Sequence, residues 1–295
     1  MQGRIVKGIA GFYYVYAEGF GLYECRARGI FRNRKLKPLV GDQVEIEVVD
    51  ENDREGNILE ILPRVTELVR PAVANVDQAL VIFAATRPKP NLSLLDRFLL
   101  MMDRQSIPTM ICFNKMDEAS EPELAALGSI YRDCGSRVLF TSAREGAGVG
   151  ELRDLLRGHT TTVAGPSGVG KSTLINRIVP DARMETGNIS EKIDRGKHTT
   201  RHSELFRIEA DSYIFDTPGF SSLEPEGMEK EELRYSFHEF DPYEGGCRFQ
   251  GCVHSMEPGC AVKEAVQAGR ISRERYDSYL QLYRELQEKE KRRYM

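Results

Sequence analysis

Apolar and polar positions alternate over short distances in the first part of the chain. Up to about residue 68, short runs of β-branched and aromatic residues alternate with Gly, Asp and Asn turn signals, which is typical of a small all-β module. The expected strands are 4–9, 12–17, 21–27, 43–49 and 57–62. Because five short strands fit a barrel such as an OB-fold, we predict an OB-type β-barrel domain over residues 1–68.

After a connector at 63–76, the pattern of apolar positions changes and predicts buried strands that alternate with helices. Continuous apolar strands are expected at 78–85, 109–113 and 138–141, and a helix at 93–103. This alternation is typical of a doubly wound α/β sheet, in which ligands bind at the carboxyl ends of the strands. Polar residues stand at those ends, so we expect this sheet to carry the functional site.

A complete phosphate-loop motif, G-x-x-x-x-G-K-[ST], lies between a β-branched run at 160–163 and a helix expected at 172–179. It consists of Gly165, Pro166, Ser167, Gly168, Val169, Gly170, Lys171, Ser172 and Thr173. Glycines let backbone N–H groups curl round an anion, and the helix N-terminus adds favourable partial charge. We expect Lys171 to reach the β- and γ-phosphates and the Ser172 hydroxyl to bind Mg²⁺. A glycine-rich turn that binds nothing is the alternative.

Two further strand ends carry residues suited to reading a guanine base. The strand at 109–113 runs into Asn114, Lys115, Met116 and Asp117. The Asp117 carboxylate can accept two hydrogen bonds from guanine, whereas adenine offers no such donor pair. By itself, this tetrapeptide is also compatible with an Asx turn. The third strand ends in Thr141, Ser142 and Ala143, whose backbone N–H groups are expected to reach the guanine oxygen.

The region after the phosphate loop carries candidates for sensing the γ-phosphate. The segment His198, Thr199, Thr200 offers hydroxyls that can complete the Mg²⁺ shell, and we favour Thr200 over Thr199. A short strand at 213–215 then ends in Asp216, which is expected to hold Mg²⁺ through water. In the same Asp-Thr-Pro-Gly motif, the Gly219 N–H is expected to contact the γ-phosphate.

The order of these motifs differs from that of an ordinary GTPase. The base-reading motifs at 114 and 141 precede the phosphate loop at 165. We therefore predict a circularly permuted P-loop GTPase domain over residues 69–222. In this domain, a helix at 150–158 leads directly into the phosphate-loop strand and so joins what are the two termini of an ordinary GTPase domain. Such a join is physically easy because the termini of a domain often lie close together.

The C-terminal part combines a metal-ligand set with helical patterns. Cys247, Cys252, His254 and Cys260 stand among glycines, and three thiolates with one imidazole make a closed tetrahedral set for structural zinc. The alternative is that they are merely small buried residues. His238 is too far away in sequence to be a preferred ligand. We therefore predict a helical zinc-binding domain over residues 223–295.

Helical signals surround this cluster, and the remaining cysteines are scattered. An acidic, helix-like stretch spans 224–239, and a helix at 272–292 is expected to bury one face. That face carries Tyr276, Tyr279, Leu280, Tyr283 and Leu286. Cys25, Cys112 and Cys134 are isolated, and we interpret them as structural.

Charge and hydropathy restrict the class of protein. A net charge of −4 over 295 residues argues against a generally basic, nucleic-acid-coating protein. The longest apolar run, 79–85, is far shorter than a membrane span, and no signal segment is evident, so we expect a cytoplasmic protein without a membrane partner. A monomer is the simpler expectation.

One local patch is strongly basic. It comprises Arg26, Arg28, Arg32, Arg34, Lys35 and Lys37. On a barrel that also carries Phe12, Tyr14 and Tyr16 on one strand face, this patch predicts an RNA-binding surface that tracks the backbone and stacks bases. A solvated loop is the alternative for the charges, and a core position is the alternative for the aromatic rings.

The motif set resembles one family, the ribosome small-subunit-dependent GTPase A (RsgA) family of bacteria. The likeness covers essentially the whole chain, from the barrel through the permuted motifs to the Cys-Cys-His-Cys module. It implies a GTP hydrolase that acts late in maturation of the small ribosomal subunit, contacts its rRNA through the barrel and zinc domains, and is stimulated by that subunit.

One position bears on how hydrolysis is achieved. Many GTPases carry a water-orienting glutamine after the last glycine of the Asp-Thr-Pro-Gly motif, but here the residue is Phe220. A phenyl ring cannot orient water, so the polar group must come from His198 or from the bound ribosome, and such a group is worth about 10³ to 10⁵ in rate. A solvated loop histidine is the alternative for His198. A P-loop ATPase or kinase, and an RNA-binding scaffold with a structural nucleotide site, are the competing functions.

Overall fold

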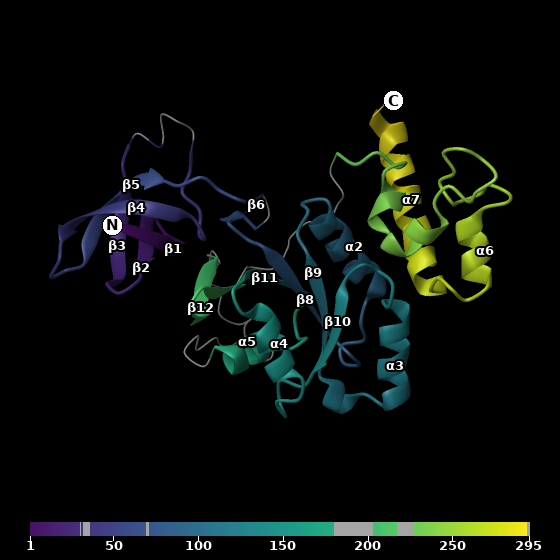
Figure 1. The fold of residues 1–295 in the computed structure, drawn as a ribbon, viewed down its shortest axis with the longest axis horizontal. Helices are drawn as coiled ribbons and strands as arrows, with labels where there is room; N and C mark the ends of the chain where they lie inside the picture. Colours follow the sequence, from purple (N-terminus) through teal and green to yellow (C-terminus); the bar gives the residue numbers. More distant parts are fainter. Residues whose placement is uncertain (30, 32–35, 69–70, 180–202, 217–226, 294–295) are drawn as a thin grey trace, which may run out of the picture. The chain divides into compact units, whose positions relative to one another are not determined.

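The computed structural model describes residues 1–29, 31, 36–68, 71–179, 203–216 and 227–293. The chain forms two compact units, and both are discontinuous in sequence (Figure 1). The first comprises Met1–Leu80 and Val149–Ser221, and the second comprises Val81–Gly148 and Ser222–Met295.

The first unit begins with a closed five-stranded barrel. Its strands are β1 (Gln2–Ile9), β2 (Phe12–Ala17), β3 (Gly21–Ala27), β4 (Gln43–Asp50) and β5 (Glu55–Ile61). Strand β3 pairs in parallel with β5, the other neighbours pair antiparallel, and β1 pairs with both β2 and β4, which closes the barrel. Apolar side chains that alternate along the strands, including Ile5, Val15, Ile46 and Ile58, fill the interior. The predicted OB-type barrel is confirmed.

The same unit contains the phosphate-loop strand and its neighbours. These elements are α4 (Val149–Leu156), β11 (Thr160–Ala164), α5 (Lys171–Ile178), β12 (Glu204–Glu209) and β13 (Ser212–Asp216). Strand β11 pairs in parallel with β13, β13 pairs antiparallel with β12, and β12 pairs antiparallel with β1 of the barrel. One run of paired strands therefore joins the phosphate-loop strand to the barrel.

The expected connector contains a small sheet of its own. Strands β6 (Glu67–Leu68) and β7 (Val73–Ala74) pair antiparallel, and Val73 also forms a bridge with Val40. Leu68, Val73 and Ala74 are buried. Burial of these apolar residues explains why the segment adopts regular structure rather than an extended linker.

The second unit contains the remaining α/β elements. Strand β8 (Gln78–Ala84) crosses the boundary between the units, and β9 (Thr109–Asn114) lies between β8 and β10 (Arg137–Thr141) in the sheet order. Every residue of β8 is buried, as the continuous apolar run predicts. The helical elements are α2 (Leu92–Asp103), the 3₁₀ turn η1 (Met116–Glu118) and α3 (Glu121–Ile130). Helix α3 was not predicted from the sequence, although Ser120 and Glu123 form a capping box at its start.

The C-terminal part of this unit consists of η4 (Leu233–Ser236), η5 (His238–Tyr243), α6 (Ala261–Gln267) and α7 (Arg273–Arg293). The predicted helix-like stretch at 224–239 is wrong for its described residues, which form turns and 3₁₀ helices. Phe237 leaves helical geometry at φ −110° and ψ 78°, and its ring and that of Phe240 both pack on Tyr279. Packing of two rings three residues apart on one partner favours the tighter turns.

Helix α7 behaves as its pattern predicts. Tyr276, Tyr279, Tyr283 and Leu286 are buried, and Leu280 packs partly buried against the same core. Phe237 and Phe240 belong to that core as well. The apolar face of α7 therefore holds the C-terminal segments together.

Candidate functional site

The phosphate loop follows β11 and leads into α5, as the motif requires. Gly165, Gly168 and Gly170 have φ values of 138°, 81° and 90°, a region that residues with a side chain rarely adopt. The Lys171 ammonium donates to the Gly165 carbonyl at 2.9 Å and to the Pro166 carbonyl. The loop is thus curled around its own lysine, and its glycines supply the backbone conformation that a phosphate cradle needs.

Two strands bring the phosphate-loop and magnesium candidates to one edge. In the parallel pair of β11 and β13, Thr162 is in register with Phe215. The strands β11 and β13, which end at Ala164 and Asp216, therefore have their carboxyl ends side by side. The phosphate loop begins at the same edge of the sheet at which Asp216 lies. His198, Thr199, Thr200 and Gly219 lie outside the described residues, as does Phe220.

In the second unit, Asn114 joins the two base-reading motifs. Its side chain is 1% exposed, and its Oδ1 accepts hydrogen bonds from the Ala143 N–H at 3.0 Å and the Thr141 hydroxyl at 3.1 Å. The Ser142 N–H donates to the Ala147 carbonyl at 2.9 Å. Of the three residues whose N–H groups are expected at the guanine oxygen, Ser142 and Ala143 therefore make hydrogen bonds within the protein here. Asn114 holds the ends of β9 and β10 together.

The residues after Asn114 turn sharply. Lys115 has a left-handed φ of 62°, and its ammonium donates to the Arg87 carbonyl at 2.7 Å. The following 3₁₀ turn contains Met116 and leaves Asp117 exposed. Its carboxylate is thus accessible for the donor pair of a base.

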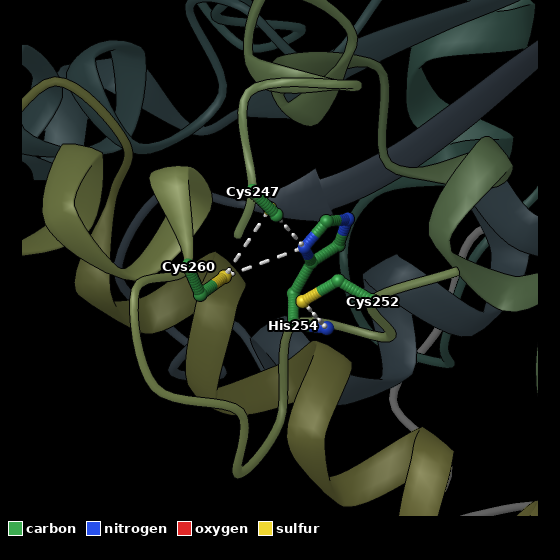
Figure 2. Close-up of side chains that lie close together, drawn as sticks. All are labelled: Cys247, Cys252, His254 and Cys260. Atoms are coloured by element: carbon green, nitrogen blue, oxygen red, sulfur yellow. Dashed lines mark hydrogen bonds between the residues drawn. The ribbon is translucent and has the colours of Figure 1, made fainter. Parts of the chain in front are cut away.

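The four predicted metal ligands converge (Figure 2). Among the described residues, Cys247, Cys252, His254 and Cys260 form one group whose ligand atoms all lie within 4.8 Å of one another. The Sγ atoms of Cys247 and Cys260 are 3.9 Å apart, and they lie 3.6 and 3.4 Å from Nδ1 of His254. Tetrahedral zinc, with bonds of about 2.3 Å to sulfur and about 2.0 Å to nitrogen, implies edges of about 3.8 and about 3.5 Å. The cluster therefore fits a tetrahedral metal ion.

His238 lies apart from this cluster, as predicted. Its Nε2 lies 3.1 Å from Asp103 and its Nδ1 lies 3.2 Å from Asp241. Burial lowers the pKa of His238, but the two carboxylates outweigh burial, so the pKa is raised above its ordinary value. The residue links α2 to the C-terminal segments through charge.

The three isolated cysteines are buried and free of disulfides. Burial raises the pKa of Cys25 to about 11 and that of Cys112 to about 12. Burial also raises the pKa of Cys134. Because the thiolate is the reactive form, these side chains are inert core residues, which agrees with their interpretation as structural.

The aromatic and basic residues of the barrel lie outside its core. Phe12, Tyr14 and Tyr16 are half-buried, whereas Val15 and Ala17 on the opposite face are fully buried. The core alternative for the three rings is therefore excluded. Among the basic residues, Arg26, Arg28 and Lys37 are exposed, while Arg32, Arg34 and Lys35 lie outside the described residues.

Some of these groups already have partners. The Arg26 guanidinium lies 4.9 Å from the centre of the Phe12 ring, and Arg28 forms an ion pair with Glu47. An exposed arginine stacked on a half-buried ring offers a surface on which a base can be placed. The arrangement suits contact with a nucleic-acid strand.

A buried charge cluster in the second unit was not predicted from the sequence. Arg275 of α7 is 2% exposed and donates to Asp96 of α2 at 2.5 Å and to Glu239 of η5 at 2.6 Å. Burial lowers the pKa of Arg275, but the charges of Asp96 and Glu239 outweigh burial, so the pKa is raised. The available signal was spacing, because Arg275 stands four residues before Tyr279 on the apolar face of α7. The cluster binds the C-terminal segments to α2.

Among the helices that the structure describes, none is both long and apolar enough to span a membrane.

The chain is similar to known proteins over nearly its whole length. The RsgA N-terminal domain family matches residues 2–58, and the RsgA GTPase family matches residues 61–226. A relative from Agathobacter rectalis, named small ribosomal subunit biogenesis GTPase RsgA, is 56% identical over 301 residues, covering 99% of this chain and all of the relative.

Two solved structures are similar over nearly the whole chain. YjeQ from Thermotoga maritima has a TM-score of 0.80 and 36% identity, covering 97% of this chain and 98% of its own. YloQ, described as a circularly permuted GTPase, has a TM-score of 0.77 and 39% identity, covering 98% of this chain and 95% of its own. Both confirm the permuted GTPase fold that the motif order predicts. The chain belongs to the RsgA family of circularly permuted GTPases.

Proposed function

We propose that this chain hydrolyses GTP as a late-acting factor in maturation of the small ribosomal subunit, and that the subunit stimulates it. The observation that carries the proposal is the parallel pairing of β11 with β13, which brings the ends of the phosphate-loop strand and the Asp216 strand together. The name of the relative from Agathobacter rectalis supports the choice of the small ribosomal subunit as partner.

The nucleotide roles follow the chemistry of each motif. Residues 165–173 bind the phosphates, with Lys171 at the β- and γ-phosphates. Residues 114–117 form the guanine site together with Ser142 and Ala143, which Asn114 holds in place. Ser172 and Asp216 hold Mg²⁺ together with Thr199 or Thr200. When bound, Mg²⁺ neutralises charge that develops on the phosphate oxygens. The Gly219 N–H contacts the γ-phosphate.

The metal group takes one zinc ion in a structural role. Its donors are soft thiolates and one imidazole, which favour zinc over magnesium or calcium. Four protein ligands leave no open position for a substrate, so this ion stabilises the C-terminal domain rather than taking part in hydrolysis.

The barrel binds rRNA through its basic and aromatic face. Arg26, Arg28 and Lys37 contribute from described positions, and Arg32, Arg34 and Lys35 contribute from the same basic segment. We assign residues 1–68 to the barrel, 69–222 to the GTPase domain and 223–295 to the zinc-binding helical domain. The protein acts in the cytoplasm as a monomer that cycles between GTP and GDP.

The test is hydrolysis of GTP and of ATP by the purified protein, with and without purified small ribosomal subunits. GTP-selective turnover that rises strongly with the subunit is the expected result, and large ribosomal subunits serve as the matched control. ATP turnover equal to that of GTP would identify a P-loop ATPase or kinase instead. A Lys171→Ala variant that fully retains its role in subunit maturation would point to an RNA-binding scaffold with a structural nucleotide site.

A further inference from the structure

The two ring nitrogens of His254 face different partners. Nδ1 lies 3.6 Å from the Cys247 sulfur and 3.4 Å from the Cys260 sulfur, so it points into the metal group (Figure 2). Nε2 lies 2.9 Å from Oε1 of Glu244, which is outside that group. The side chain of His254 is 1% exposed, and that of Glu244 is 29% exposed. The imidazole is therefore held between the metal donors and one carboxylate.

This arrangement selects one tautomer of the histidine. A neutral imidazole carries a single N–H, and a metal ligand must present the lone pair of the other nitrogen. A carboxylate accepts a hydrogen bond and cannot donate one when ionised. With Glu244 at Nε2, the N–H is placed on Nε2 and the lone pair on Nδ1, toward the three sulfurs.

Other contacts fix the ring in this orientation. The Phe240 ring meets the His254 imidazole edge to face, with ring centres 5.7 Å apart and an angle of 81°. The Tyr276 hydroxyl donates to the backbone carbonyl of His254 at 2.7 Å. His254 itself has a left-handed φ of 55°. Rotation of the ring to present Nε2 to the sulfurs would break both the hydrogen bond to Glu244 and the packing against Phe240.

Glu244 is in turn held by an arginine that also contacts the metal loop. One Arg234 nitrogen lies 3.8 Å from Oε2 of Glu244, and the same nitrogen donates to the Cys252 carbonyl at 2.7 Å. Glu244 also follows the last residue of η5, and its backbone there is extended. The carboxylate is therefore placed by the fold, rather than being a mobile surface group near a histidine.

We propose that Glu244 is the positioning residue of the metal site: it holds His254 as the Nε2–H tautomer, so that the metal binds through Nδ1. Carboxylates that accept from a metal-bound histidine typically change metal affinity by about 10- to 100-fold. This inference concerns the metal site alone and does not depend on the proposed ribosomal function.

The experiment measures Zn²⁺ affinity of the full-length protein by competition with a chromophoric chelator. Glu244→Ala is expected to weaken Zn²⁺ binding by about 10- to 100-fold. The Zn²⁺ affinity of Glu244→Gln is expected to lie between those of Glu244→Ala and the unmodified protein, because the amide oxygen can still accept from Nε2 while the charge is lost. Glu264→Gln is the matched control, since Glu264 is an exposed carboxylate of the same domain on α6, and its affinity should be unchanged.

A second readout separates positioning from general stability. In long-range ¹H–¹⁵N spectra of the Zn²⁺-loaded protein, His254 should show a metal-bound Nδ1 and a protonated Nε2, and Glu244→Gln should shift the Nε2 resonance. Glu264→Gln should leave that resonance in place. Equal Zn²⁺ affinity in Glu244→Ala and the unmodified protein would overturn the proposal, as would metal bound to Nε2. Glu244→Gln preserves shape and keeps the test decisive if Glu244→Ala fails to fold.

Discussion

Lys7 of the barrel and Glu204 of β12 are partners across an antiparallel strand pair, and their side chains form an ion pair at 3.0 Å. On its other side, Glu204 is in register with Asp216, the last residue of β13. The strand that ends at the candidate magnesium residue is thus joined to the barrel through one intervening strand. We expect β12 to transmit local changes between the two because paired strands share backbone hydrogen bonds.

Replacement of Lys7 by Glu should loosen β12. The change places a like charge against Glu204. Because the side chains of Lys7 and Glu204 are 34% and 38% exposed, solvent screens this repulsion, and the loss of stability should stay below about 1 kcal/mol. Hydrogen exchange of peptides covering 204–209 should become faster, and a second change, Glu204→Lys, should restore the original rate.

Arg28→Glu is the control for that experiment, because it breaks an exposed ion pair with Glu47 elsewhere on the barrel. It should leave exchange in β12 unchanged. If Lys7→Glu and Arg28→Glu have the same effect on β12, the link through Glu204 is not the cause.

Replacement of Arg275 by Ala should destabilise the second unit strongly. It leaves Asp96 and Glu239 buried without their partner, and breaking a buried ion pair in this way costs about 3–5 kcal/mol. The free energy of unfolding in urea, followed by tyrosine fluorescence, measures the loss. Arg273→Ala is the control, because its pair with Asp277 is exposed, and a comparable loss in that variant would contradict the role of burial.

Replacement of Asp117 by Asn should change base preference. The amide keeps one acceptor oxygen but loses the charge that favours the two guanine donors. Since charge-assisted hydrogen bonds contribute about 1.5–3 kcal/mol each, GDP affinity should fall at least about 100-fold. Calorimetric titration with GDP and with the xanthine nucleotide, which lacks the amine, provides the measurement.

The xanthine nucleotide should gain affinity in Asp117→Asn, because an amide N–H can donate to its additional carbonyl, whereas the Asp117 carboxylate can only accept. Glu118→Gln changes the exposed neighbour in the same turn and serves as the control. Equal losses for both nucleotides would mean that Asp117 does not read the base.

Replacement of His238 by Gln should remove a pH-dependent part of stability. Because the folded pKa of His238 is raised, its contribution is fully present below the unfolded value of about 6.5 and is lost as pH rises through the folded pKa. The histidine is 41% exposed, so the effect should remain within about 1 kcal/mol. Urea midpoints of the two proteins should therefore differ most at acidic pH and converge as pH rises.

Asp103→Asn supplies the check on that pH dependence. It removes the charge at Nε2 of His238, so the extra acid-side stability should shrink in this variant as well. A constant difference between His238→Gln and the unmodified protein from pH 5.5 to 8.5 would contradict the assignment.

Replacement of His198 by Ala should abolish subunit-stimulated hydrolysis and leave GTP affinity intact. Phe220 cannot orient water, so the polar group must be supplied elsewhere, and a stabilising group of this kind is worth about 10³ to 10⁵ in rate. The rate of single-turnover GTP hydrolysis in the presence of small ribosomal subunits measures this effect, and His202→Ala is the control from the same segment. Unchanged stimulated turnover in His198→Ala would assign the group to the ribosome.

The sequence by itself determined the features that depend on near neighbours in the chain. The barrel strands follow from alternating apolar positions and turn residues, and the phosphate loop follows from glycines set between a strand and a helix. The order of short motifs was sufficient to predict the permutation. The Cys247 to Cys260 spacing predicted the metal group, because its four donors lie within one short segment.

Only the tertiary structure decided which distant residues meet. Arg275 and Asp96 are 179 positions apart, and nothing in the local pattern of either residue identifies the other as its partner. The same holds for Lys7 and Glu204, which are 197 positions apart. For Glu244 the difficulty was different, because an exposed acid and a carboxylate that holds a metal-bound histidine have the same sequence signature. Charge becomes informative about position only when burial and a partner at hydrogen-bonding distance are known, and both are set by packing of the whole chain.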